Sequence, residues 1–219
     1  MLGRLFIILL AALLGACDSA PPAADVTRIN LPTTGIQVVG ENFDSSLKDW
    51  QFFDGTWEHL DDQGNGTLTQ TADHLGRRMF PLALWKQHRF TDTDVSVRFK
   101  TISGEMDASG GLVFRAHDGD NYYIARANSL EDNIRLYKFT DGNRSRIAGA
   151  TLTPPALGQW HTLRVVALGT QIQVYLNDTL YIDHRDETLT AGYVGLWTKA
   201  DAVTAFDDLT VRGIPTDTQ

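Results

Sequence analysis

Arginine and tyrosine side chains recur at strand-like spacing in the segment 109–139, SGGLVFRAHDGDNYYIARANSLEDNIRLYKF. Two polar turn clusters divide it into three β-rich runs, which carry Arg115, Arg126 and Arg135 among apolar residues. Because successive side chains of a strand point to opposite faces, we expect these arginines and Tyr122 to share one polar sheet face. Three arginines and several tyrosines on adjacent strands make this a candidate binding face. An ordinary solvated sheet face has the same composition, and this alternative stays open.

Catalytic carboxylates are the second chemistry that the sequence could supply. Glycoside hydrolysis commonly uses two of them, about 5 to 5.5 Å apart for retention or 6.5 to 9.5 Å apart for inversion. The segment 105–110, EMDASG, fits the acid pattern E-x-D-x-x-E only in its first two acids, because Gly110 replaces the third. Most other candidate acids stand in predicted turns, where solvated Asp is common, so the catalytic residues stay unknown. These acids are Glu58, Asp118, Asp120, Glu131, Asp132 and Asp201.

Metal-binding residues form no motif that the sequence alone reveals. The six histidines are scattered, without H-x-H or H-E-x-x-H spacing. Oxygen ligands suit calcium, and Asp44, Asp207 and Asp208 lie near the predicted first and last strands, which are neighbours in many sandwiches. These acids could equally cap turns or pair with Arg212. We therefore expect no resident cofactor, with calcium as the one candidate to test.

The N-terminal sequence has the features of a secretory signal. Arg4 precedes an apolar run over residues 5–14, which is shorter than the ~20 residues needed to span a membrane. The following LLGAC resembles a bacterial lipobox, and the resemblance implies cleavage after residue 16 and acylation of Cys17. We therefore expect a lipid-anchored protein of the bacterial cell envelope that faces the periplasm, and Asp18 favours the inner membrane. The alternative is an ordinary signal peptide with an incidental cysteine.

The composition is that of one globular domain with polar ends. Of the 219 residues, 42% are hydrophobic and 21% are charged. We expect a signal peptide over 1–16, a lipidated cysteine and flexible tether over 17–39, one domain over 40–213 and a polar tail over 214–219. The net charge of −8 argues against a nucleic-acid or anionic-membrane partner, which needs clustered Lys and Arg. Neutral ligands remain open.

The domain is predicted to be all-β. Residues 94–100, 161–167 and 171–177 alternate apolar and polar side chains, as strands with one buried face do. Residues 72–88 alternate less regularly, and we expect a loop there with a short strand near 82–85. About a dozen strands without a helix predict two packed antiparallel sheets, with Trp160 and aliphatic side chains between them.

These strand motifs together resemble a known family. GGLVFR, DNYYIARAN, DNIRLYK, GQWHTLRV, IQVYLNDTLY and GYVGLWTKADAVTAFDDLTV are similar to the 3-keto-disaccharide hydrolase domain, a branch of the concanavalin A-like and laminin G-like jelly rolls. The resemblance runs from about Phe43 to Val211 and implies a two-sheet antiparallel jelly-roll sandwich. It also implies a carbohydrate ligand, because this family and its relatives include glycoside-cleaving enzymes and sugar-binding modules. Fold alone does not decide between the two.

The predicted binding residues combine the arginine row with positions that the resemblance implies. Recognition of a carbohydrate or glycoside is the preferred hypothesis, because the sequence shows no carboxylate pair or metal site. An enzyme that cleaves 3-keto-disaccharides and a non-catalytic envelope module that contacts a protein are the alternatives.

Strand alternation also allows Tyr122 and Trp197 to be core residues. The candidate ligand-binding residues are Arg115, Asn121, Tyr122, Arg126, Asn133, Arg135, Trp197, Lys199 and Asp201.

Overall fold

The computed structural model describes residues 27–44 and 46–216. No helix in this part of the chain is long and apolar enough to cross a membrane. The predicted signal peptide, Cys17, Asp18 and most of the predicted tether lie outside the described residues, as do residues 217–219. The end of the predicted tether already belongs to the first strand, which begins at Gln37 and pairs with the last strand.

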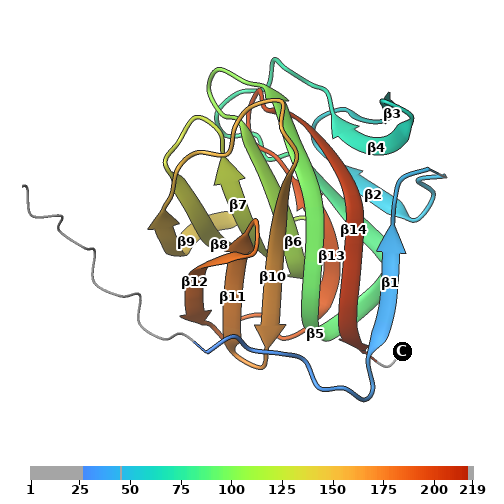
Figure 1. The fold of residues 1–219 in the computed structure, drawn as a ribbon, viewed down its shortest axis with the longest axis vertical. Coiled ribbons are helices and arrows are strands. Elements are labelled where there is room, and N and C mark those ends of the chain that lie inside the picture. The colour runs from blue at the N-terminus through green and yellow to red at the C-terminus, as the bar shows by residue number, and fades with distance from the viewer. Residues whose placement is uncertain (1–26, 45, 217–219) are drawn as a thin grey trace, which may run out of the picture.

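The strands form two layers of antiparallel sheet that share one long strand, β5 (Leu82–Ser103), as Figure 1 shows. The first sheet, nearer the viewer, contains β12 (Thr179–Arg185), β11 (Gln171–Leu176), β10 (His161–Leu168), the second half of β5, β14 (Val203–Pro215) and β1 (Gln37–Glu41). It continues from β14 through β4 (Asn65–Gln70) and β3 (Trp57–Asp62). The second sheet contains β2 (Trp50–Phe53), the first half of β5, β13 (Gly192–Trp197), β6 (Ser109–Ala116), β7 (Tyr122–Asn128), β8 (Asn133–Thr140) and β9 (Asn143–Thr151).

Strand β5 joins the sheets because its two halves pair with different neighbours. Residues 82–85 pair with β2 and β13, whereas residues 93–99 pair with β10 and residues 93–103 run along β14. Between these halves, residues 86–89 alternate between partial and full exposure. Residues 72–81 form a loop and a strand begins at Leu82, as predicted, but the prediction that this strand is short was wrong. The polar residues 86–89, which suggested that the loop continues, lie where one continuous strand passes from one sheet to the other.

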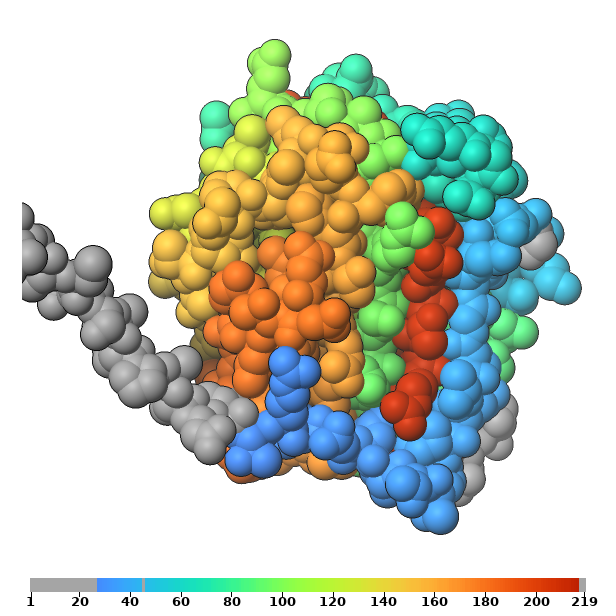
Figure 2. Space-filling model, in the orientation of Figure 1, coloured from blue at the N-terminus to red at the C-terminus, as the bar shows by residue number. Residues whose placement is uncertain are grey.

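The core between the sheets is built by strand alternation. Val95, Val97 and Phe99 of β5 are buried, and Val97 pairs in register with Leu163 of β10. The second sheet contributes side chains such as Phe114, and the space-filling view shows β10, β5, β14 and β1 packed side by side over the near face (Figure 2). The prediction of an all-β, two-sheet antiparallel sandwich is confirmed.

Trp160 does not belong to this core. Its ring is half-buried at the surface, its Nε1 atom donates to the Asp62 Oδ2 atom at 3.1 Å, and the Arg98 guanidinium carbon lies 4.7 Å from the ring centre. The expectation that Trp160 fills the layer between the sheets was wrong, because it precedes β10 and packs against charged groups at the surface.

A second apolar cluster covers the outer face of the second sheet. Trp197 is fully buried there, and the ring of Phe80 stacks on it with centres 5.7 Å apart. The segment before β5 reaches this position because the Thr198 and Ala200 amides donate to the carbonyl oxygens of Pro81 and Met79. This segment therefore covers part of the outer face, so only the remaining part is open to a ligand.

Candidate functional site

A buried polar cluster lies where β7 ends and β8 begins. The Arg126 Nη2 atom donates to the Glu131 Oε2 atom at 2.8 Å, and the Asn133 Nδ2 atom donates to the same oxygen at 3.0 Å. Arg126 and Asn133 are only 6% and 7% exposed. Burial alone would raise the pKa of Glu131, but the hydrogen bonds from Asn133 and Arg126 outweigh it and lower that pKa. The carboxylate is therefore ionised at neutral pH and fixes both side chains, and we call these three residues the Arg126–Asn133 site.

Two polar atoms of this site have no hydrogen-bond partner among the described residues. They are Arg126 Nη1, which is a donor, and Asn133 Oδ1, which is an acceptor, and both are buried. An unpaired buried polar group costs about 1–3 kcal/mol, so such groups normally pair with a water or a ligand. A sugar hydroxyl can both donate and accept, so neighbouring hydroxyls match this donor and acceptor.

Lys199 and Asp107 lie near this site, at the ends of β13 and β6. The Lys199 Nζ atom donates to the Asp107 Oδ2 atom at 2.8 Å, and Asp107 is fully buried. The charge of Lys199 also contributes to the lowered pKa of Glu131. Asp201 instead accepts hydrogen bonds from backbone amides of the loop before β6, so it shapes that loop and is not directed at a ligand.

Further arginine and aromatic side chains extend the site along the outer face. Arg126 pairs in register with Arg135, and Gly149 on β9 leaves the room that the Arg135 side chain occupies. Tyr137 lies two residues further along β8 and is half-buried. The guanidinium carbons of Arg126 and Arg144 lie 6.0 and 4.8 Å from its ring centre. The structure thus brings together the predicted residues Arg126, Asn133 and Arg135, with Lys199 beside them.

Arg115 lies away from this site, which corrects its prediction as a member of the same polar face. It is 1% exposed, and its guanidinium donates to the Thr91 and Leu189 carbonyl oxygens and to Asp92 at 3.1 Å. Burial lowers the pKa of Arg115, although the carboxylate of Asp92 opposes this. The backbone at Arg115 has a φ of 50°, which interrupts the strand alternation on which the prediction relied.

Three more residues that were predicted to contact a ligand make contacts within the protein instead. They are Tyr122, Trp197 and Asn121. Tyr122 is 1% exposed and its ring stacks on Phe139 at 4.4 Å, and burial raises the pKa of its hydroxyl. Trp197 lies under Phe80, as described above. Asn121 bonds to Asp118 and to the Asp141 amide, so it joins two turns. Buried rings cannot stack on a sugar, so the exposed aromatic surface comes from other residues.

The predicted calcium ligands line a small cavity of about 140 Å³ beside β14. The Arg98 Nη1 atom lies 2.9 Å from Asp208 and 3.7 Å from Asp207, so an arginine already supplies positive charge there. Burial raises the pKa of Asp207. Within residues 27–44 and 46–216, no three His, Cys, Asp or Glu side chains converge as a metal site would require. Calcium binding by Asp44, Asp207 and Asp208 therefore stays a prediction.

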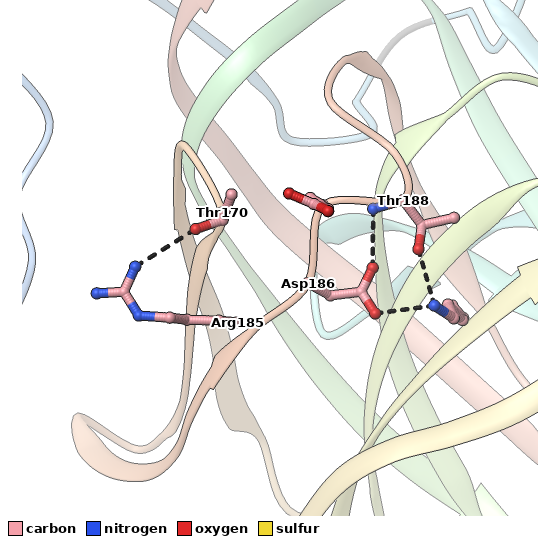
Figure 3. A pocket seen from close by; sticks show the side chains of 6 residues that line it. Thr170, Arg185, Asp186 and Thr188 are labelled. Atoms are coloured by element: carbon pink, nitrogen blue, oxygen red, sulfur yellow. Dashed lines mark hydrogen bonds and ion pairs between the residues drawn. The ribbon is translucent and has the colours of Figure 1, made fainter.

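A larger cavity of about 520 Å³ opens at the rim between the two sheets (Figure 3). Asp186 lines this cavity and accepts hydrogen bonds from the Thr188 amide at 2.9 Å, Lys138 Nζ at 2.9 Å and the Tyr123 hydroxyl at 2.5 Å. Burial would raise the pKa of Asp186, but these hydrogen bonds lower it strongly. Burial and the bond to Asp186 raise the pKa of Tyr123 to about 12. The carboxylate is fully engaged, so this cluster joins the sheets.

The two carboxylates near the Arg126–Asn133 site are poorly suited to protonate a leaving group. A general acid needs a carboxyl group whose pKa is raised toward neutrality. Glu131 has a lowered pKa, and Asp107 is buried in an ion pair with Lys199. The geometry therefore favours binding of a polar ligand over hydrolysis.

Sequence reasoning missed several residues of the site. Glu131 was considered only as a turn acid, although it fixes both Arg126 and Asn133. Tyr137 could have been found, because it stands two residues after Arg135 and so faces the same side of β8. Phe80 could not, because it lies in a segment without strand periodicity.

The fold and this cluster define a jelly-roll domain of the carbohydrate-binding or glycoside-hydrolase-like class. The chain belongs to the family of 3-keto-α-glucoside-1,2-lyase-like domains, whose sequence model matches residues 40–212. This confirms the resemblance found in the sequence.

Two similar proteins and one structural neighbour show how far the likeness extends. A levanase of Bacillus subtilis (strain 168) is 28% identical over 172 residues, which are 77% of this chain and 23% of the levanase. The carbohydrate-binding module CBM66 of Bacillus subtilis is 25% identical with a TM-score of 0.64, over 75% of this chain and 96% of the module. A β-glucanase of Bacillus licheniformis, 12% identical with a TM-score of 0.52 over 80% of this chain and 97% of its own, shares the fold alone.

Proposed function

We propose that this domain recognises a carbohydrate or glycoside through the Arg126–Asn133 site without cleaving it. The observation that carries the proposal is the pair of buried, unpartnered atoms, the donor Arg126 Nη1 and the acceptor Asn133 Oδ1. Neighbouring sugar hydroxyls would pair with both atoms. The half-buried ring of Tyr137 offers apolar surface to the C–H face of a sugar ring.

The relatives support the same ligand class. The CBM66 module is described as carbohydrate-binding, and this chain covers 96% of it. The levanase is named for its action on levan, but this chain covers only 23% of that enzyme. The similarity therefore favours recognition over the activity of the whole enzyme, and levan belongs among the first ligands to test.

Cleavage of a glycoside is the second candidate, because the family is described as lyase-like. A lyase needs a base that removes a proton, and Glu131 is ionised at neutral pH. Turnover of a 3-keto-α-glucoside that is lost in Glu131→Gln would establish this candidate in place of simple recognition.

Calorimetric titration with levan and a panel of glucosides tests recognition. We expect Asn133→Ala and Arg126→Ala each to weaken binding at least about tenfold, because each removes a buried hydrogen bond to the ligand. Arg212→Ala is the matched control, since Arg212 lies on the first sheet and is 51% exposed. Melting curves confirm that each variant is folded. Unchanged affinity in both site variants would contradict the proposal.

We also propose that Cys17 carries a lipid that anchors the domain to the envelope membrane, facing the periplasm. The support is the lipobox-like LLGAC sequence. Radioactive palmitate should label the protein but not Cys17→Ser, which should leave the membrane fraction. Labelling of the Cys17→Ser variant would refute the anchor.

A further inference from the structure

The outer face of the second sheet gathers arginines around one aromatic ring. Strand register places Arg126 opposite Arg135 and Tyr137 opposite Arg146, and Arg144 pairs with Phe139 on the same face. We call Arg126, Arg135, Arg144 and Arg146 the arginine face. Residues 126–146 contain five Lys and Arg against three Asp and Glu, in a chain whose net charge is −8.

The arginine face differs from three arginines of the first sheet in how its charge is balanced. On the first sheet, Arg98 pairs with Asp208 at 2.9 Å, Arg164 with Asp94 at 2.6 Å and Arg212 with Asp94 at 3.8 Å. On the arginine face, Arg126 pairs with Glu131. The other three are Arg135, Arg144 and Arg146. In the described part of the chain, no carboxylate lies within 4.0 Å of their guanidinium groups, and their side chains donate no hydrogen bond. This face therefore presents positive charge that the protein leaves unneutralised.

Arg144 is also held in position. Its guanidinium carbon lies 4.6 Å from the ring centre of Phe80 and 4.8 Å from that of Tyr137. Stacking against aromatic rings restrains the guanidinium plane but leaves its N–H groups free to donate along their edges. Two parallel N–H donors match the two oxygens of a carboxylate, a geometry that a neutral hydroxyl does not use.

We propose that the arginine face selects glycans that carry carboxylate groups, such as uronic acids. This inference rests on the proposed function, because the hydroxyls of the same ligand would occupy the Arg126–Asn133 site. The carboxylate would contact Arg144 and Arg146 beside Tyr137. Among the described residues, Glu131 pairs with Arg126, and no carboxylate lies within 4.0 Å of Arg135, Arg144 or Arg146.

A matched pair of ligands tests this selection. Oligogalacturonate and its methyl ester share the same sugar ring and differ in charge. We expect calorimetry at low salt to show oligogalacturonate binding about tenfold tighter than the ester, and added salt should reduce the difference. The double variant Arg144→Gln, Arg146→Gln should abolish the preference. Arg212→Gln removes one positive charge from the first sheet and should retain it.

The outcomes separate this inference from the proposed function. Equal affinity for the acid and the ester would overturn carboxylate selection while leaving carbohydrate recognition intact. Single-stranded DNA that binds as tightly as oligogalacturonate, with the same loss in the double variant, would show a general polyanion surface and overturn it as well. If neither saccharide nor any sugar of the panel binds, the proposed function fails first.

Discussion

At the scale of single residues, Glu131 and Asp186 are both carboxylates held by hydrogen bonds, but their roles differ. Each carboxylate accepts several hydrogen bonds, and in each case these lower a pKa that burial would raise. Around Asp186, neither Tyr123 nor Lys138 has a buried polar atom without a hydrogen-bond partner. Around Glu131, Arg126 and Asn133 each retain a buried atom without a partner. The Asp186 cluster therefore connects the two sheets, whereas the Glu131 cluster is the candidate ligand-binding site.

Replacing Asp186 by Asn is expected to lower the free energy of unfolding at neutral pH by about 1–3 kcal/mol, because it weakens hydrogen bonds to a charged acceptor. Since the folded-state pKa is lowered, this stabilisation is complete above the unfolded-state pKa of about 3.9 and is lost as pH falls through the folded-state pKa. Urea unfolding from about pH 7 to pH 3 measures it, with Glu187→Gln as the control from the same cavity. A deficit that does not shrink in acid would contradict this assignment.

At the scale of elements, the segment before β5 covers part of the outer face of the second sheet. It is fixed by amides of the β13–β14 loop and carries Phe80 onto Trp197. Gly111 on β6 makes room beneath, because a Cβ atom there would lie 3.2 Å from Trp197 Cε3 and 2.4 Å from Ile124 Cδ1. The position of this segment therefore determines how much aromatic surface a ligand can reach.

Phe80→Ala is expected to expose Trp197 and to cost about 1–2 kcal/mol, less than for a fully buried ring because Phe80 is half-buried. Quenching of tryptophan fluorescence by iodide should increase. The exposed Leu157, at 46% exposure, supplies a control in Leu157→Ala. Quenching identical to the unaltered protein would show that Phe80 does not protect Trp197.

Some elements follow from the sequence because side-chain alternation is a local signal. Val165 of β10 and Val174 of β11 are buried, as alternation predicts. The continuity of β5 did not follow, because its polar residues lie at a passage between sheets, which depends on partners distant in the sequence. Arg115 was misplaced for a related reason, since a φ of 50° cannot be read from alternation.

At the scale of the whole molecule, shared pairing through β5 makes both sheets parts of one hydrogen-bonded structure. We therefore expect a single cooperative unfolding transition in urea. Far-ultraviolet circular dichroism reports on all strands, whereas tryptophan fluorescence weights buried rings such as Trp197. The two transition curves should coincide, and two separated midpoints would contradict the shared architecture.

The candidate site was predicted only in part, for reasons that act across the whole molecule. Arg126, Asn133 and Arg135 were found because they lie on adjacent strands of one segment, so local pairing brings them together. The net charge of −8 argued against anionic partners such as nucleic acid, but charge is distributed unevenly. Acids pair with Arg98, Arg164 and Arg212 on the first sheet, whereas on the arginine face only Arg126 has a carboxylate partner among the described residues. Only the three-dimensional arrangement reveals this asymmetry.

The most direct test of carbohydrate recognition is a crystal structure of the protein with a bound oligosaccharide from the calorimetric panel. We predict that sugar oxygens lie within hydrogen-bonding distance of Arg126 Nη1 and Asn133 Oδ1, with a ring of the sugar near Tyr137. A saccharide bound at the Asp186 cavity or on the first sheet, with Arg126 Nη1 and Asn133 Oδ1 free of it, would contradict the account.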